Sequence, residues 1–342
     1  MSRRDDAAAL LRSLPVLADL PEDEIDNLAA LSEPFAVAPG EVLFEEGDPA
    51  EAVFIIGSGE LESIKRLPGD RALTTARLGP GTALGEMAMI AGVPRVATAR
   101  AVEATSGIAV EAHAVQQLLG GANPGARELI IRIGQQALRI LRSVVERTAS
   151  ELDQDVRASQ AMRELAPARS EVTPIRPGPD EANYLSTILF FDRFSRDQLS
   201  ELFDDMPRLA APRGTELVAE GERPDALLFV LRGAVESTVH HGRAAARVRL
   251  SGPGRIVTHL GALDDGPCPF DCRARERVVL LEAPVERLVE LRERDDAAWR
   301  LFRLGVYQDV VDAIVQADRP LARMAAAGEE VREKQGRSRS GP

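Results

Sequence analysis

Cysteine and lysine are almost absent from this chain of 342 residues. Its two cysteines, Cys268 and Cys272, are too few for the disulfide framework of a secreted protein and too few for a zinc site without other ligands. No apolar run approaches the roughly 20 residues that span a bilayer, and the N-terminal stretch places two aspartates before a very short apolar segment. The sequence therefore favours a cytoplasmic protein with no membrane partner.

Positive charge comes almost entirely from arginine, since Lys65 and Lys334 are the only lysines, and alanine is abundant. This bias suggests a GC-rich bacterial genome and says nothing about function. The net charge is −12 and the isoelectric point is about 5.0, so the field of the whole chain repels nucleic acid. We expect no nucleic acid among the partners.

What the chain does have is globular composition, with 44% hydrophobic and 28% charged residues, and enough length for two domains. It also contains an internal repeat. A shift of 174 positions aligns the two halves without a gap for about 45 residues, and a shift of 173 continues the alignment after one hairpin loop. The repeat places Gly40, Gly47 and Gly59 on Gly214, Gly221 and Gly233, and Gly69, Gly81 and Pro94 on Gly242, Gly254 and Pro267.

Spaced glycines and short apolar runs, such as VFII at residues 53–56 and LLFV at residues 227–230, are typical of a many-stranded antiparallel roll. The predicted fold class is therefore mainly β with flanking helices, as two tandem β-rolls of the jelly-roll type. Apolar spacing predicts one helix before each roll, over residues 21–31 and 196–203.

A long helix without proline is predicted after the first roll, over residues 126–166. It carries two apolar stripes, of which one can cover the roll while the other meets a partner. We expect the second stripe to join two chains in a homodimer; the alternative is that the second roll folds back over it. This stripe consists of Ile130, Ile133, Ala137, Ile140 and Val144.

The predicted organisation is a first domain over residues 10–166, a linker with four prolines over residues 167–182, a second domain over residues 183–325 and a disordered tail over residues 326–342.

The segment that carries chemistry is GTALGEMAMIAGVPRVATAR at residues 81–100. Gly85 and Glu86 open a short helical turn, and Arg95 follows Glu86 by nine residues at the start of an alternating strand. Backbone N–H groups at the start of such a turn can cradle an anion, and a guanidinium can pair a phosphate through two parallel hydrogen bonds. A carboxylate can accept a hydrogen bond from a ribose hydroxyl, so together these groups fit a sugar phosphate.

This segment resembles the phosphate-binding cassette of the cyclic nucleotide-binding domain family, which includes the catabolite activators and the regulatory subunits of protein kinase A. The family pattern is GE, six to nine residues, PR, small residues and a strand, and the upstream EEGD at residues 45–48 and GSGEL at residues 57–61 also match it. The resemblance is strong over residues 14–119 and weak over residues 190–291.

The resemblance implies that Arg95 holds the cyclic phosphate and Glu86 the ribose 2′-hydroxyl, while backbone amides near Gly85, Met87 and Ala88 supply further phosphate contacts. It implies a sensor that relays a helix rearrangement to an unidentified protein partner or to the dimer interface. The expected ligand is cAMP rather than cGMP, because guanine preference in the family accompanies a hydroxyl residue where this chain has Val96. The predicted site consists of Gly85, Glu86, Met87, Ala88, Pro94, Arg95, Val96 and Ala97.

The second roll departs from this pattern, and we expect it to bind no phosphate. Both charged contacts are lost, and Asp264 and Asp265 add negative charge. By the 173-residue shift, Thr258, His259, Cys268 and Phe270 take the places of Gly85, Glu86, Arg95 and Ala97.

Other interpretations compete with cyclic nucleotide sensing. Glu86 and Arg95 could form a mere surface ion pair, in a scaffold or cargo protein with inert rolls. A transcription regulator of the catabolite-activator class needs a helix-turn-helix after the long helix, where this chain has a linker and a second roll. No catalytic constellation is visible, so we expect no enzyme. The spacing of Cys268 and Cys272 is not CxxC, so we expect no metal.

Overall fold

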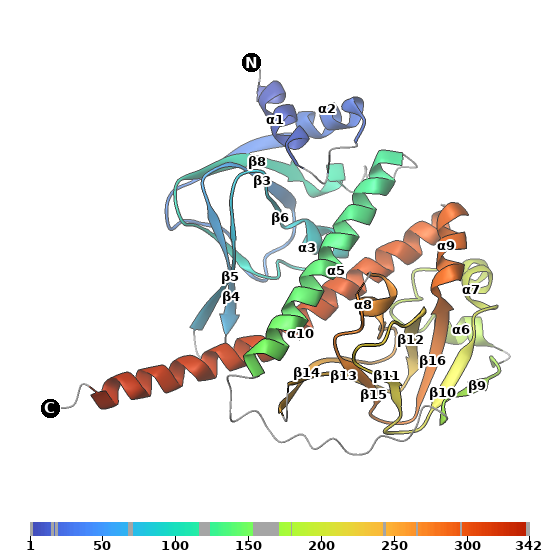
Figure 1. Cartoon of the computed structure of the whole chain (residues 1–342). Coiled ribbons are helices and arrows are strands. Elements are labelled where there is room, and N and C mark those ends of the chain that lie inside the picture. Colours follow the sequence, from blue (N-terminus) through green and yellow to red (C-terminus); the bar gives the residue numbers. More distant parts are fainter. Residues whose placement is uncertain are drawn as a thin grey trace. The chain divides into compact units, whose positions relative to one another are not determined.

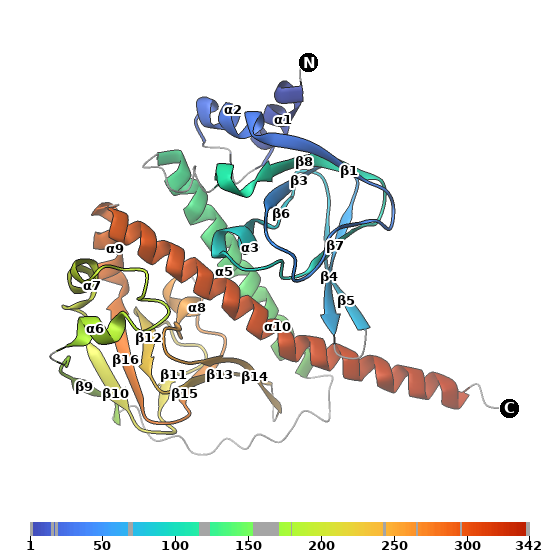
Figure 2. The ribbon, with the colours of Figure 1, turned by 180° about the vertical axis from the view of Figure 1, so that it is seen from behind.

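The computed structural model describes residues 3–14, 17, 20–67, 71–115, 124–152, 171–178, 180–241, 244–264, 266–294 and 296–339. The chain divides into two compact units, residues 1–137 and 138–342, and the boundary falls within the long helix α5 (Pro124–Leu152). Each unit contains one β-roll, called domain 1 and domain 2 below (Figures 1 and 2).

Domain 1 consists of two four-stranded antiparallel sheets, with strand orders β1-β8-β3-β6 and β2-β7-β4-β5. Its apolar core lies between the sheets, where Val37, Ile56 and Leu84 of one meet Leu61 and Ala99 of the other. The strands are β1 (Ser32–Val37), β2 (Val42–Phe44), β3 (Ala52–Ser58), β4 (Leu61–Leu67), β5 (Arg71–Leu78), β6 (Ala83–Leu84), β7 (Thr98–Ala101) and β8 (Thr105–Glu111).

Helices α1 (Arg3–Arg12) and α2 (Glu22–Ala30) precede the first roll, and α3 (Glu86–Ala91) lies between β6 and β7. The prediction of a helix over residues 21–31 is confirmed by α2. Its first turn contains three acidic residues, Glu22, Asp23 and Glu24, whose negative charges interact favourably with the positive end of the helix dipole.

Domain 2 repeats this plan, with sheet orders β12-β16-β10-β9 and β11-β15-β13-β14. Its strands are β9 (Thr173–Ile175), β10 (Arg208–Ala211), β11 (Glu216–Val218), β12 (Ala226–Arg232), β13 (Val235–His241), β14 (Ala244–Ser251), β15 (Asp271–Ala274) and β16 (Val278–Pro284). Its helices are α6 (Glu181–Leu185), α7 (Arg196–Phe203), α8 (His259–Ala262), α9 (Val285–Arg294) and α10 (Ala297–Arg339).

The helix predicted over residues 196–203 is α7, and it begins with a capping box. The Ser195 hydroxyl accepts from the Gln198 backbone N–H while the Gln198 side chain accepts from the Ser195 N–H.

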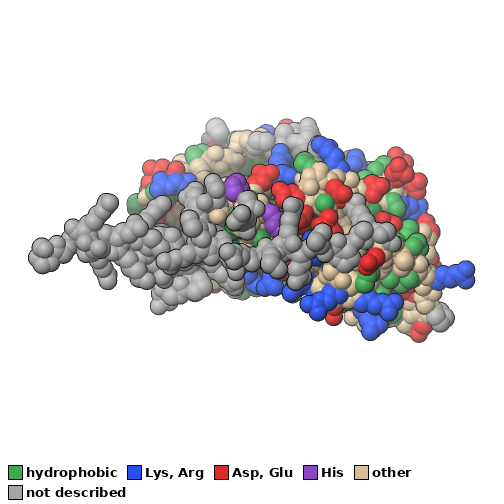
Figure 3. Space-filling model, turned by 60° about the horizontal axis from the view of Figure 1, so that its bottom comes forward, with side chains coloured by type: hydrophobic (Ala, Val, Ile, Leu, Met, Phe, Trp, Pro, Cys, Tyr) green, Lys and Arg blue, Asp and Glu red, His purple; other side chains and the backbone are tan. Residues whose placement is uncertain are grey.

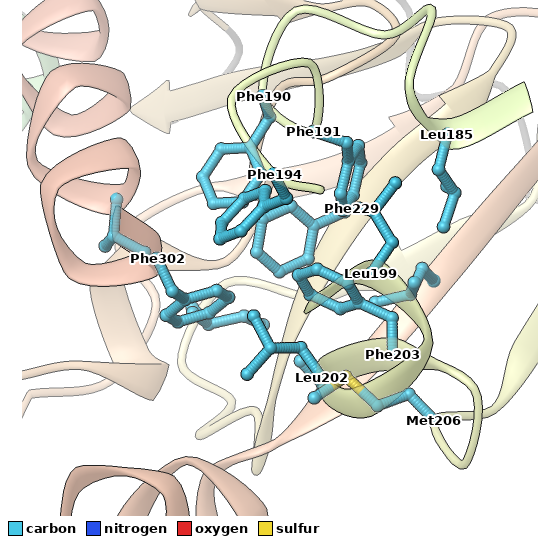
Figure 4. Close-up of a cluster of buried hydrophobic side chains, with 14 of the residues drawn as sticks. Leu185, Phe190, Phe191, Phe194, Leu199, Leu202, Phe203, Met206, Phe229 and Phe302 are labelled. Atoms are coloured by element: carbon cyan, nitrogen blue, oxygen red, sulfur yellow. The ribbon is translucent and has the colours of Figure 1, made fainter. Parts of the chain in front are cut away.

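The core of domain 2 is aromatic. Phe190, Phe191 and Phe194 precede α7, Phe229 comes from β12, and Phe302 of α10 completes the cluster (Figure 4). Neighbouring ring centroids lie 4.7–6.3 Å apart, mostly edge-on or tilted, which suits the ring quadrupoles. This cluster fixes the first half of α10 against its own roll.

Two sequence predictions are corrected by the structure. The predicted linker is partly a strand, since Thr173–Ile175 pairs with β10 at the sheet edge, where Pro174 is tolerated because an edge strand needs fewer N–H donors. The predicted disordered tail is helical through Arg339, because alanine, arginine and glutamate, all strong helix formers, predominate after Pro320.

A matched pair of leucines tests this packing. Leu202 of α7 is fully buried in the aromatic core, whereas Leu189 is 59% exposed. We predict that Leu202→Ala lowers the free energy of unfolding of domain 2 by about 2–5 kcal/mol because it leaves a cavity, and that Leu189→Ala changes it by less than about 0.5 kcal/mol. Urea unfolding of the two full-length variants checks this, and similar losses would contradict the assigned core.

Candidate functional site

The cassette of domain 1, residues 85–97, begins at a glycine that the local geometry requires. Gly85 is the N-cap of α3 and has a φ of +86°, in the left-handed region that favours glycine. A Cβ atom at this position would lie 2.0 Å from Nη1 of Arg95. Glycine is therefore required at position 85 both by the left-handed backbone of the turn and by the space that the Arg95 guanidinium occupies.

Arg95 is only 4% exposed, and its guanidinium is held by two backbone carbonyls. Nη2 donates to the Ala52 carbonyl at 2.7 Å, and Nη1 donates to the Gly85 carbonyl at 3.3 Å. Nε has no hydrogen-bond partner among the described residues. A buried N–H without a partner is uncommon and carries a desolvation cost unless a ligand supplies an acceptor.

Two aromatic rings also contact this guanidinium. Its Cζ atom lies 4.3 Å from the centroid of Phe44 and 5.5 Å from that of Phe54, and the two rings stack with their centroids 5.6 Å apart. Such cation–π contacts stabilise a charge removed from water. Sequence reasoning missed both phenylalanines, because an aromatic residue on a short strand is usually read as core. The available signal was that Phe44 directly precedes the EEGD turn.

Burial shifts the pKa values of both predicted charged contacts. Burial lowers the pKa of Arg95, against the opposing effect of Asp48 and Glu86. Burial raises the pKa of Glu86 to about 7, although its own backbone amide and Arg95 oppose this rise. The two side chains form no ion pair in the described part of the chain, so the surface-pair interpretation does not apply: Arg95 turns inward instead.

The remaining predicted residues lie around these groups. Ala88 is 2% exposed, Met87, Val96 and Ala97 are partly buried, and Pro94 is exposed. The strand after the arginine, β7, begins at Thr98 rather than at Arg95 itself. The structure thus brings Gly85, Glu86 and Arg95 together and leaves Pro94 at the surface.

The cassette is tied to the turn after β2 by main-chain hydrogen bonds. The Gly47 N–H donates to the Arg95 carbonyl at 2.8 Å, and the Arg95 N–H donates to the Asp48 carbonyl at 2.8 Å. In addition, the Glu46 N–H donates to the Thr98 hydroxyl at 2.9 Å.

Domain 2 repeats the same hydrogen bonds, which confirms the alignment of the repeat. The Gly221 N–H donates to the Cys268 carbonyl at 2.8 Å, and the Cys268 N–H donates to the Glu222 carbonyl at 2.7 Å. The Glu220 N–H donates to the Asp271 carboxylate at 2.8 Å, in the place of Thr98. These hydrogen bonds are shared by the two domains, although the side chains at the bonded positions differ.

Those side chains make the second cassette, residues 258–270, unlike the first. Helix α8 contains non-helical backbone angles at Leu260 and Gly261, so its amides do not form a regular helical start. The hydroxyl of Thr258, at the position of Gly85, accepts from the Leu228 N–H and donates to the Ala226 carbonyl. His259 and Cys268 are buried, at 2% and 1% exposure.

Cys268 and Cys272 are free, and burial raises the pKa of the Cys272 thiol. A search of the described residues finds no cluster of three or more His, Cys, Asp or Glu that could hold a metal ion.

The second cassette receives an arginine from α5. Arg142 Nε donates to Asp264 at 2.6 Å, and the other Asp264 oxygen accepts from the Gly261 N–H at 2.7 Å. The guanidinium passes over Gly266, where a Cβ atom would lie 2.4 Å from Nη2. Asp264, predicted to repel phosphate, thus binds an arginine of the chain itself, whereas Asp265 lies outside the described residues.

None of the helices in the described ranges combines the length and apolar character that a bilayer crossing needs. On the face drawn in Figure 3, acidic and basic side chains are intermixed over the described surface.

The sequence matches one family model twice. The model describes a cyclic nucleotide-binding domain, and the matches span residues 34–121 and 208–295, together just over half of the chain.

Curated relatives align over single stretches. The cAMP-dependent protein kinase regulatory subunit of Blastocladiella emersonii is 36% identical over 93 residues, which are 27% of this chain and 23% of that protein. An uncharacterized NTE family protein of Mycobacterium bovis is 31% identical over 100 residues, 29% of this chain and 16% of that protein. The acetyltransferase Pat of Mycolicibacterium smegmatis is 30% identical over 131 residues, 38% of each protein. The chain therefore spans well under half the length of these relatives.

Among solved structures, the regulatory domain of Toxoplasma gondii PKA with cAMP aligns with 90% of this chain and 95% of its own, at 17% identity and a TM-score of 0.33. A cyclic nucleotide-binding-like protein from Brucella abortus aligns with 34% of this chain and 100% of its own, at 27% identity and a TM-score of 0.31.

The close contact between Gly85 and Arg95 predicts that alanine destabilises the protein more at Gly85 than at Gly81. Gly81 also has a positive φ, +77°, but a Cβ atom there would meet nothing within 4 Å. We predict that Gly81→Ala costs about 1–2 kcal/mol of stability through backbone strain alone, and that Gly85→Ala costs at least about 2 kcal/mol more because it also displaces a buried charge. Urea unfolding of both variants provides the comparison; equal losses would show that the guanidinium is not seated against Gly85.

Glu86 predicts a pH dependence of stability. Its folded pKa of about 7 exceeds its ordinary value of 4.5, so the folded state holds the proton more tightly between these values. The free energy of unfolding therefore falls as pH rises from about 4.5 to about 7, by about 3 kcal/mol, and is level above that. Glu86→Gln should lose this part of the slope in urea unfolding at pH 5–8, whereas Glu103→Gln, at an exposed position, should keep it. Identical slopes in the two variants would refute the assignment.

Proposed function

The chain belongs to the cyclic nucleotide-binding domain family, and on this premise we propose that it is a non-enzymatic regulatory protein that binds one cyclic nucleotide, cAMP, in domain 1. The observation that carries the proposal is the buried guanidinium of Arg95, which faces the left-handed Gly85 with its Nε–H unpartnered. A cyclic phosphate supplies the acceptor that this N–H lacks.

The other predicted residues fit the rest of such a ligand. Glu86 is the first residue of α3, where its carboxyl can accept a hydrogen bond from the ribose 2′-hydroxyl. The amides of Gly85, the N-cap, and of Met87 and Ala88 lie at the N-terminal end of that helix. The Ala52 and Gly85 carbonyls orient Arg95, and the rings of Phe44 and Phe54 support it from one side. Domain 1 thus offers a phosphate an oriented positive charge in a surrounding that is partly shielded from water.

Packing supports a single site per chain. Leu43, Phe44 and Phe54 are only partly buried in domain 1, whereas their counterparts Leu217, Val218 and Leu228 are buried in domain 2, at 8% exposure or less. A roll that leaves its inner aromatic and aliphatic side chains partly exposed has apolar surface for a ligand to cover. The second roll has no exposed apolar surface at these three positions that a ligand could cover.

The proposed preference for cAMP over cGMP rests on Val96. This partly buried side chain follows the cassette arginine and offers no hydroxyl to a guanine base. A hydrogen-bond donor on the base that meets no acceptor loses its interaction with water without replacement.

The proposed relay runs through α5. This helix is continuous from Pro124 to Leu152, and its Arg142 is bonded to Asp264 of the second cassette. A ligand in domain 1 that favours one position of α5 would therefore change a contact in domain 2, to the extent that its affinity for the two arrangements differs. The protein partner that receives this signal is unidentified.

Homodimer formation through the second stripe of α5 stays a prediction. Ala137 and Val144 of that stripe are already buried within one chain, and Ile140 is partly buried, while the side chains of Ile130 and Ile133 lie outside the described set. A cytoplasmic location and the absence of nucleic acid and membrane partners belong to the same proposal.

Calorimetric titration of the full-length protein with cAMP and cGMP tests the proposal. We predict one cAMP per chain and weaker binding of cGMP. Arg95→Ala should weaken cAMP binding by about 2–5 kcal/mol because the phosphate loses its buried partner, and Arg95→Lys should restore part of the loss, since it keeps the charge without the planar fork.

The matched control is Cys268→Ala, at the position of Arg95 in the repeat. It should leave both stoichiometry and affinity unchanged. Unchanged affinity in Arg95→Ala would refute the site, and two equal sites per chain would refute the assignment to domain 1 alone.

A further inference from the structure

Domain 2 contains a buried charged cluster that the proposed function does not use. Arg249 of β14, His259 of the second cassette and Asp309 of α10 are 6%, 2% and 2% exposed. Charges this deep in a protein are costly unless each one is paired.

The Asp309 carboxylate is surrounded by donors. Its Oδ2 accepts from Arg249 Nη2 at 2.9 Å and from the Ile256 N–H at 3.0 Å, and it lies 2.7 Å from Nε2 of His259. Its Oδ1 accepts from Arg255 Nη1 at 3.2 Å. Burial alone would raise the pKa of Asp309, but Arg249 and His259 hold it well below its ordinary value, so the group is an anion.

The ring of His259 also faces the Asp309 carboxylate with a donor. Arg249 Nη1 donates to Nδ1 at 3.2 Å, which leaves the ring proton on Nε2. Nε2 lies 2.7 Å from the Asp309 carboxylate, although the angle is not that of a regular hydrogen bond. A ring that accepts at Nδ1 is neutral, and burial also lowers the pKa of His259. Two guanidinium groups, one main-chain amide and one imidazole therefore converge on a single anion.

The repeat shows where this anion lies. His259 occupies the position of Glu86, and Ile256 matches Ala83, two residues before the cassette. Arg249 has no counterpart in domain 1, because the matching residue of β5 is Ala76, which is exposed. Domain 2 has therefore lost the arginine of its cassette and gained another from the neighbouring strand.

We propose that Asp309 is the resident ligand of domain 2: its carboxylate occupies an anion site built from Arg249, Arg255, His259 and the Ile256 amide, and so holds α10 on the roll without a nucleotide. The site suits a carboxylate, because Arg249 donates to one of its oxygens and Arg255 donates to the other. When this carboxylate is removed, the site should accept a small monocarboxylate from solution.

The chain provides its own reporter for this test. Trp299, the single tryptophan, lies in the first turn of α10 and stacks on Phe302 with ring centroids 5.4 Å apart. Its emission follows the docking of α10, ten residues before Asp309.

The experiment compares Asp309→Ala with Asp312→Ala in the full-length protein. Asp312 lies on the same helix within 3.7 Å of Arg249 and Arg255, but its side chain is 29% exposed. We expect Asp309→Ala to lower the unfolding midpoint of domain 2 by roughly 6 °C or more and to shift Trp299 emission to the red, and Asp312→Ala to change both far less. Sodium formate at about 100 mM should recover at least half of the lost midpoint in Asp309→Ala by mass action, relative to sodium chloride at equal ionic strength, and should leave the wild type unchanged.

Recovery by formate that disappears when Arg249→Met is added supports a carboxylate site. Equal effects of the two aspartate substitutions, or no difference between formate and chloride, would overturn the proposal. If Asp309→Ala does not fold, the double variant Arg249→Met, Asp309→Leu tests the proposal instead. Removal of both charges should restore a folded domain 2, and an unfolded double variant would count against the proposal. Nucleotide binding by domain 1 enters none of these measurements, so their outcome is independent of the proposed function.

Discussion

Two main-chain hydrogen bonds hold each cassette to the turn before it, and the rest of the site depends on them. In domain 1 the backbone of Arg95 is joined to Gly47 and Asp48, and in domain 2 the backbone of Cys268 is joined in the same way to Gly221 and Glu222. Because these bonds involve no side chain, the residue at this position can change without loss of the loop. The frame therefore survives in a domain whose ligand chemistry has been replaced, which explains how one roll can keep an arginine and the other a cysteine at the same point.

Both rolls nevertheless bury an arginine in or next to the cassette, Arg95 in domain 1 and Arg249 in domain 2, and the two differ in what balances the charge. Arg95 rests on the faces of Phe44 and Phe54 and on two carbonyls, with its Nε unpartnered among the described residues. Arg249 meets the carboxylate of Asp309 from the same chain. Since a buried charge needs a partner, the arrangement of Arg95 fits the external anion proposed for the first roll, whereas Arg249 is paired within the chain.

The sequence was sufficient for the parts of this structure that follow a local or repeated pattern. Spaced glycines and the repeat predicted both rolls, and the GE and PR pairs predicted the meeting of Gly85, Glu86 and Arg95. The ion pair between Arg249 and Asp309 could not be predicted, because its partners are 60 residues apart and neither belongs to a motif. The strand at Thr173–Ile175 could not be recognised because it contains Pro174 and is followed by Pro177 and Pro179, and closely spaced prolines usually mark a linker. The helical end of α10 was missed because charge was read as disorder, although the same residues favour a helix.

The two rolls also differ in how completely they are filled, and this has a consequence for their stability. Domain 2 packs Phe302 and Trp299 of α10 into a core of six or more aromatic rings, whereas domain 1 leaves Phe44 and Phe54 partly exposed beside Arg95. Less buried apolar surface means a smaller contribution to the free energy of folding. A ligand that binds only the folded form of domain 1 then raises the stability of that domain by mass action. This stabilisation matters most for the segments of the domain that unfold most easily without ligand. The looser packing of domain 1 therefore fits the ligand response proposed for it, whereas the filled core of domain 2 leaves less stability for a ligand to add.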